Sequence, residues 1–209
     1  MQAVIKRGES FSMESIGNAI YSSFAFLNHS CNPNTVKYWE GDRMVVVASQ
    51  VIRKGQEVTD NYGMHFLNTG RAVRRQWLHD TFWFQCGCPA CEAEWPVRDQ
   101  VSDKPGNVIC MSSGAGCDKL MRASGDTWTC PGCGRSRDNA QLKSFLSAQV
   151  MKTVNTAQCD LDEESARRVY KDILDDLYTT VSHPWRGLIM PEQLFWKAVR
   201  MTNGNKAFI

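Results

Sequence analysis

Nine cysteines stand out in this 209-residue chain, because most of them are spaced as metal ligands commonly are. The first group has the pattern C-x-C-x-x-C and consists of Cys86, Cys88 and Cys91. The second group has the pattern C-x6-C followed by C-x-x-C, and consists of Cys110, Cys117, Cys130 and Cys133. Cys31 stands alone upstream, and the left-over Cys159 is expected to be a buried helix residue. In a reducing compartment such clusters indicate structural Zn(II) sites rather than disulfides, and the first group leaves one of four positions vacant.

The segment at 96–138, which contains the second group, is rich in Gly, Ser, Asp and Cys and poor in apolar residues. It cannot form a core of its own, so a metal ion would have to organise it. The pattern resembles a zinc ribbon with an unusually wide first pair, and four thiolates leave no open position for catalysis. The turns that bring the thiolates together are expected at Gly114, Gly116, Gly125, Gly132 and Gly134. The alternative is a set of unmetallated surface cysteines.

Composition excludes few partners but disfavours two. The formal net charge is only +2, which argues against nucleic acid or an anionic membrane. No apolar stretch approaches the roughly 20 residues that span a bilayer, and the N-terminal sequence MQAVIKRGESF lacks the apolar core of a signal peptide. We therefore expect an intracellular chain, in the cytoplasm, the nucleus or both. The basic run Arg71, Arg74 and Arg75 is expected to be a solvated helix face.

The elements that must position the first group follow from the hydrophobic pattern. Two β-rich runs, 35–39 and 43–49, flank a turn and predict a hairpin. A second turn leads into a short strand expected at 57–59. Apolar residues at approximate helical spacing predict one helix over 66–84, directly before the cysteines.

Beyond residue 139 the apolar residues follow the helical period. The pattern predicts a first helix over 142–154. A second helix is expected to begin at the acidic residues near 162 and to end at His183-Pro184. A third is expected to begin at Pro191-Glu192. Three amphipathic helices with short loops indicate an antiparallel module. The fold class expected for the chain is α+β.

Three segments, in this order, resemble the signatures of SET-domain proteins. The first is NHSCNPN at 28–34, which alone would be a polar loop closing an apolar run. The second is GQEVTDNYG at 55–63, and the third is FQCGCPAC at 84–91, a post-SET cysteine cluster. A post-SET cluster between a helix and further helices is similar to the SET-and-MYND lysine methyltransferases, most of all to their member 4 branch.

This resemblance implies S-adenosyl-L-methionine as cofactor and a role for five residues. Asn28 and His29 match positions that contact the cofactor, partly through backbone groups, and Phe84 matches the aromatic residue that packs on its adenine ring. Tyr62 matches the catalytic tyrosine at the inner end of a lysine channel. Cys31 matches the fourth thiolate of the first zinc site, which would tie the cofactor side to the post-SET loop.

The implied organisation has four parts. They are the C-terminal part of a SET domain (1–65), a helix with the post-SET cluster (66–95), a zinc-ribbon-like segment (96–138) and an incomplete helical module (139–209). The family also carries a Gly-x-Gly cofactor loop and a MYND zinc finger. The Gly-Ala-Gly at 114–116 lies among the cysteines of the second group and cannot serve as that loop.

The implied function is an S-adenosylmethionine-dependent protein-lysine N-methyltransferase, expected to be an incomplete chain. Its partners would be a protein with a target lysine and, through the helical module, other proteins. The rival hypothesis is a catalytically inactive, zinc-stabilised interaction module or pseudoenzyme. A zinc-ribbon nucleic-acid binder is disfavoured by the low net charge.

Overall fold

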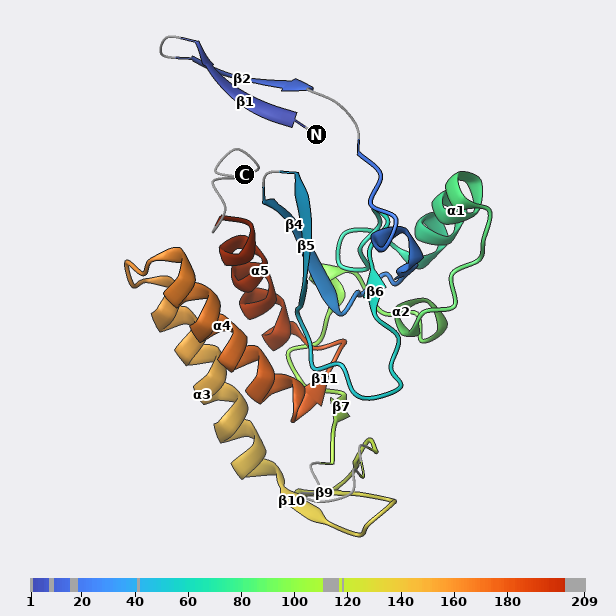
Figure 1. Cartoon of the computed structure of the whole chain (residues 1–209). Helices are drawn as coiled ribbons and strands as arrows, with labels where there is room; N and C mark the ends of the chain where they lie inside the picture. Colours follow the sequence, from blue (N-terminus) through green and yellow to red (C-terminus); the bar gives the residue numbers. More distant parts are fainter. Residues whose placement is uncertain are drawn as a thin grey trace.

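The computed structural model describes residues 2–7, 10–15, 19–40, 42–110, 117 and 119–201. It combines helices with short strands, which is the α+β class that the sequence predicts. Three long C-terminal helices lie side by side, and two shorter helices lie across a central hairpin from them (Figure 1).

The central hairpin consists of β4 (Thr35–Glu40) and β5 (Arg43–Ala48), which confirms the hairpin predicted there. Val36 and Tyr38 are buried because alternate residues of a strand share a face. A further antiparallel hairpin, formed by β1 (Gln2–Arg7) and β2 (Ser10–Ser15), precedes it.

The first two signature segments meet through a parallel pair of very short strands. These are β3 (Asn28–His29) and β6 (Thr59–Asp60), in which Asn28 faces Thr59. The strand expected at 57–59 therefore starts two residues later than predicted.

Helix α1 (Arg71–Phe82) is shorter than the helix predicted at 66–84. Val73, one of the apolar residues whose spacing predicted this helix, is 59% exposed. The buried positions are Arg74 and Leu78 instead. The helical period was misassigned because an arginine occupies a position that points into the protein.

The C-terminal module consists of α3 (Asn139–Ala157), α4 (Glu163–Tyr178) and α5 (Arg186–Met201). Asp138 and Asp162 cap the first two helices, because each carboxylate accepts a hydrogen bond from a backbone amide three residues on. Both helices were predicted, but α4 ends at Tyr178, before the predicted end at His183-Pro184, because Val181 and Ser182 form the strand β11.

The predicted start of the third helix is wrong, because α5 begins five residues before Pro191, which lies inside it. A proline suits the first turn of a helix, and the sequence was interpreted on that basis. Leu188 and Ile189 are buried, so packing holds the preceding turn helical despite the amide that Pro191 lacks.

The remaining elements are short. β7 (Asn107–Val108) pairs with β11 (Val181–Ser182), so the segment after the first cysteine group is tied to the end of α4. The second cysteine group is built around a three-stranded sheet of β8, β9 and β10. The other bounds are η1 (Phe24–Phe26), α2 (Pro89–Glu92), η2 (Arg98–Gln100), β8 (Arg122–Ser124), β9 (Thr127–Thr129) and β10 (Ser136–Asp138).

Two clusters of buried apolar side chains form the core. The larger joins the C-terminal helices and β4 to Cys110 and Cys130 of the second cysteine group. The smaller surrounds the first cysteine group and includes Ile189 of α5, so the helices pack against both. Cys159 is exposed rather than buried, because α3 ends at Ala157. No helix in the described ranges is long and apolar enough to cross a membrane.

Candidate functional site

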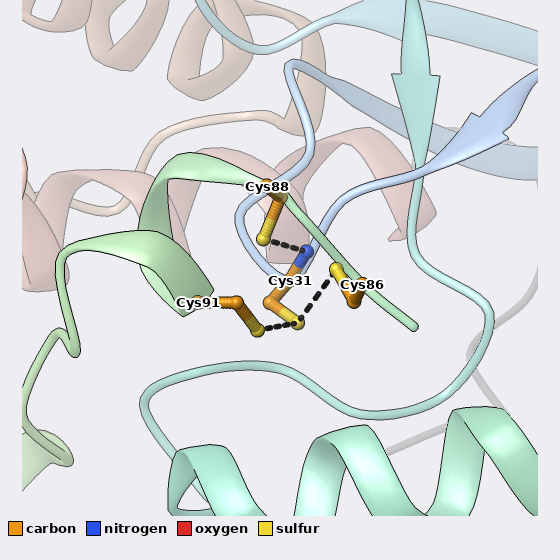
Figure 2. Close-up of side chains that lie close together, drawn as sticks. All are labelled: Cys31, Cys86, Cys88 and Cys91. Atoms are coloured by element: carbon orange, nitrogen blue, oxygen red, sulfur yellow. Dashed lines mark hydrogen bonds between the residues drawn. The ribbon is translucent and has the colours of Figure 1, made fainter. Parts of the chain in front are cut away.

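The structure brings Cys31 together with the first cysteine group. Figure 2 shows the side chains of Cys31, Cys86, Cys88 and Cys91 converging on one point. The Sγ of Cys31 lies 3.9 Å from that of Cys86 and 3.6 Å from that of Cys91. A zinc ion held by four sulfurs at about 2.3 Å sets them about 3.8 Å apart. The donor set and its spacing therefore fit one structural zinc ion.

Local backbone structure creates this convergence. Cys88 is the N-cap of α2, whose first residue is Pro89, and Cys91 lies one turn later on the same short helix. Cys31 reaches the group from the loop between β3 and β4, and its backbone amide lies 3.4 Å from the Sγ of Cys88. Hydrogen bonds from Cys31 and Cys86 hold the pKa of the Cys88 thiol far below its usual range. The loop thus favours a thiolate, the form that binds metal, at Cys88, whereas the pKa values of the Cys31 and Cys86 thiols are raised.

The basic run of α1 is not a solvated face, contrary to our expectation. Arg74 is fully buried, and its guanidinium lies 2.5 Å from Thr69 O, 3.2 Å from Ala90 O and 3.5 Å from Cys91 Sγ. Arg71 donates to Cys91 O, and Arg75 donates to Cys86 O at 3.0 Å. Three arginines of one helix therefore hold the cysteine loop, and their charge suits a metal centre with four thiolates.

The second group also comes together, at the three-stranded ribbon. The Sγ atoms of Cys110 and Cys133 lie 3.5 Å apart, and those of Cys117 and Cys130 lie 3.2 Å apart. Burial disfavours the Cys130 thiolate, but hydrogen bonds from the Cys133 amide and the Cys117 side chain outweigh it and lower its pKa to about 6. These four cysteines could hold a second structural zinc ion.

Three of the expected glycine turns are built as predicted. Gly125 has a positive φ of 58° in the turn between β8 and β9. Gly132 lies so close to the cluster that an added Cβ would stand 3.0 Å from the Sγ of Cys117. Gly134 has a positive φ of 71°, which side chains other than glycine rarely adopt. Gly114 and Gly116 lie outside the described residues.

The residues expected at the cofactor and the lysine lie together beside the first cysteine group. The ring of Tyr62 is 5.3 Å from that of His29 and 6.4 Å, edge-on, from that of Phe84. Phe82, which is not among the predicted site residues, also belongs to this group, because its ring lies 5.0 Å from that of Tyr62. Asn28 points elsewhere, because its side chain is exposed and bonded to Glu57.

Tyr62 is held at both ends of the residue. Its hydroxyl donates to the carbonyl of Leu27 at 2.7 Å, and its backbone amide donates to Nδ1 of His29 at 3.1 Å. Burial, with the nearby carboxylates of Asp60 and Glu57, raises the pKa of the Tyr62 hydroxyl. The hydroxyl is therefore protonated at neutral pH and can act only as a hydrogen-bonding group.

Arg74 and Phe82 had sequence signals that could have revealed them. Arg74 stands four residues before Leu78, so the two share a helix face. Phe82 stands two residues before the predicted Phe84, at the end of the same helix. Neither signal is decisive, because arginines are more often exposed, and Phe82 is itself 41% exposed although its ring contacts Tyr62.

Comparison with known proteins gives a family match for the N-terminal part. The SET domain family matches residues 4–63, which include the first two signature segments.

Individual relatives extend this match. Protein-lysine N-methyltransferase SMYD4 of Homo sapiens is 42% identical over 79 residues, 38% of this chain and 10% of that protein. SMYD4 of Mus musculus is 42% identical over 133 residues, 63% of this chain and 16% of that protein. Histone-lysine N-methyltransferase SMYD3 of Homo sapiens is 34% identical over 90 residues, 43% of this chain and 21% of that protein. The matched segments thus span at most about a fifth of the length of these relatives.

Proposed function

We propose, from the SET domain match and the similarity to SMYD4 and SMYD3, that this chain is of the SET-and-MYND type and forms part of a protein-lysine N-methyltransferase. The proposed methyl donor is S-adenosyl-L-methionine, and the substrate is a protein that presents a lysine amine. One observation carries the proposal: the rings of His29, Tyr62 and Phe84 adjoin one another beside the first cysteine group.

In this methyl transfer the protein has to position the reactants and control their environment more than it has to supply reactive groups. Methyl transfer to an amine is an in-line displacement at a carbon that the sulfonium of the cofactor already activates. The rings of Phe82 and Phe84 would exclude water near Tyr62, which favours the neutral, nucleophilic amine.

The Tyr62 hydroxyl would orient that amine. It already donates to Leu27 O, so its lone pairs are free to accept an N–H of the lysine. The amine then keeps its own lone pair for the methyl carbon. Phe84 would pack on the adenine ring. His29 would contribute its backbone and the face of its ring, since both ring nitrogens are committed within the chain.

The proposal includes one structural zinc ion in each cysteine group. Each group offers four sulfur ligands and no open coordination position, so the metal would supply rigidity. At the first site that rigidity would join residues 28–34 to the post-SET loop. We also propose that the chain acts in the cytoplasm, the nucleus or both.

Two substitutions test the proposal, on this chain and on the complete product of its gene. Tyr62→Phe should lower methyl transfer to protein lysines by about 100-fold, since it removes a group that orients the reacting amine. Binding of S-adenosylhomocysteine, measured by calorimetry, should change by less than about twofold in that variant, since Tyr62 faces the amine and not the adenosine.

Phe84→Ala should instead weaken binding of S-adenosylhomocysteine by at least about tenfold, through the loss of ring stacking and of buried area. Phe26→Ala is the matched control, because Phe26 is 85% exposed. If neither this chain nor the complete product of its gene binds S-adenosylhomocysteine, the proposal is contradicted and an inactive interaction module is favoured.

A further inference from the structure

Both ring nitrogens of His29 face groups of this chain. Nδ1 lies 3.1 Å from the backbone nitrogen of Tyr62, and Nε2 lies 3.3 Å from the Sγ of Cys31. The half-buried imidazole therefore bridges the first cysteine group and the tyrosine expected at the lysine.

These partners determine where the ring carries its proton. A backbone amide can only donate, so Nδ1 must present a lone pair to Tyr62. A neutral imidazole has one N–H, which then sits on Nε2 and points at the Cys31 sulfur.

His29 does not compete with the cysteines as a ligand. The four sulfurs already lie within 4.8 Å of one another, which completes a tetrahedral set without it. An N–H directed at a ligating sulfur is instead typical of the hydrogen bonds that orient a metal ligand from outside.

The segment around His29 holds Tyr62 twice. The carbonyl of Leu27 accepts from the Tyr62 hydroxyl, and the ring of His29 accepts from the Tyr62 amide. Two residues further along, Cys31 is anchored among the sulfurs of the post-SET loop. A shift of Cys31 would therefore move both supports of the tyrosine.

We propose that His29 is a positioning residue that couples a metal-bound Cys31 to the backbone of Tyr62, so that the first zinc site fixes the place of the tyrosine. The inference rests on the proposed function, because it takes zinc at Cys31 and Tyr62 at the lysine. It assigns the two ring nitrogens of His29 to the chain itself rather than to the cofactor.

The tautomer is the first test, and it requires no activity. In ¹⁵N NMR spectra of the zinc-loaded full chain, His29 should have a bare Nδ1 and a protonated Nε2. Replacement of zinc by ¹¹³Cd should then reveal coupling between the metal and the Nε2 proton across the sulfur. A ring protonated on Nδ1 would overturn the inference.

Two substitutions separate the ends of the bridge. His29→Asn retains an acceptor near the position of Nδ1 but cannot reach Cys31, whereas His29→Gln retains a donor toward Cys31 but no acceptor at Nδ1. We expect His29→Asn to release zinc to a chelator about tenfold faster with normal exchange of the Tyr62 amide hydrogen. His29→Gln should speed that exchange about tenfold with normal zinc release.

The control pair is His79→Asn and His79→Gln, since the side chain of His79 is 60% exposed near the end of α1. Both should match the wild type in zinc release and amide exchange. If both His29 variants alter the two ends equally, or alter neither while zinc stays bound, the bridge is refuted and the proposed function stands. If the purified chain holds no zinc at Cys31, the metal part of the proposed function fails together with the bridge.

Discussion

At the scale of single residues, the first cysteine group depends on side chains that the cysteine pattern does not reveal. Arg74 brings a buried positive charge to the sulfur of Cys91 and to two backbone carbonyls. A buried charge is tolerated only when hydrogen bonds and opposite charge replace the lost water. Four thiolates around a divalent ion provide that opposite charge, so arginine and metal site stabilise each other.

Replacement of Arg74 tests this dependence. Arg74→Met should lower the free energy of unfolding of the zinc-loaded chain by about 3 kcal/mol, because charge-assisted hydrogen bonds are lost and carbonyls are left unpaired. Arg74→Lys should recover only part of it, since one ammonium cannot reach three acceptors. Urea unfolding measures both. Arg168→Met, which removes an exposed ion pair on α4, should lower the free energy of unfolding by less than about 0.5 kcal/mol. An equal loss in Arg74→Met and Arg168→Met would refute the dependence of the site on Arg74.

His65 gives a pH dependence that is independent of the metal sites. Burial lowers its pKa from 6.5 to about 4, against the opposing charge of Glu192. The unfolded chain therefore binds the proton first, and stability falls as the pH drops from about 6.5 toward 4. Between pH 7 and pH 5 this residue alone should remove about 2 kcal/mol.

The variant His65→Asn isolates this contribution, because its amide oxygen can still accept from the Leu67 amide as Nδ1 does. Between pH 7 and pH 5, the free energy of unfolding of this variant should fall by about 2 kcal/mol less than that of the wild type. Parallel curves for His65→Asn and the wild type would show that His65 does not titrate as described.

At the scale of elements, sequence pattern predicted what depends on local chemistry. The β4–β5 hairpin, the ribbon glycines Gly132 and Gly134, and the acidic start of α4 follow from turn and cap preferences. The start of α5 and the buried face of α1 do not, because distant packing decides them. Leu188 is buried in the core, and its packing keeps the turn before Pro191 helical. Arg74 is buried at a position of α1 where an apolar residue would be expected.

The same distinction applies to the candidate site. Spacing alone assembled the second cysteine group, whereas Cys31 required a family resemblance, since 55 residues separate it from Cys86. The family resemblance implied that Tyr62, His29 and Phe84 belong to one site, but it did not predict which of their rings are in contact. The bond between His29 and the Tyr62 amide depends on the β3–β6 pairing, which no local signal specifies.

The cap of α4 makes a prediction at this scale. Asp162 accepts from the amide of Ser165 and from its hydroxyl, so Asp162→Ala should lower the free energy of unfolding by about 1 kcal/mol. Asp160→Ala, two residues earlier and also exposed, should have no measurable effect. Thermal melts of the two variants make the comparison, and equal melting temperatures would contradict the cap.

At the scale of the whole molecule, the two cysteine groups belong to different parts of the core. The first lies in the cluster with α1 and the aromatic residues around Tyr62. The second shares its cluster with the three long helices, and its last strand leads directly into α3 through the cap at Asp138. Loss of metal at one group should therefore loosen a different region from loss at the other.

Paired serine substitutions test this separation. Cys86→Ser with Cys88→Ser, and Cys130→Ser with Cys133→Ser, should each reduce the zinc content by about one ion per chain, as elemental analysis measures it. Structural zinc stabilises small metal-organised segments by about 10 kcal/mol or more, so the affected region should open locally. Cys159→Ser is the matched control, because Cys159 is exposed and far in sequence from both groups.

Hydrogen exchange then locates the damage in each variant. The first pair should speed exchange in α1 and around Tyr62 and leave α3 and α4 protected. The second pair should speed exchange in β7 to β10 and in the first turns of α3, where Leu142 is buried in the same cluster as Cys110 and Cys130. It should leave hydrogen exchange of the Tyr62 amide unchanged. His29 holds that amide, and Tyr62 packs against the other cluster, which surrounds the first cysteine group. Protection lost uniformly from both variants would mean that the core is one cooperative unit, and an unaffected α3 in the second would separate the ribbon from the helices.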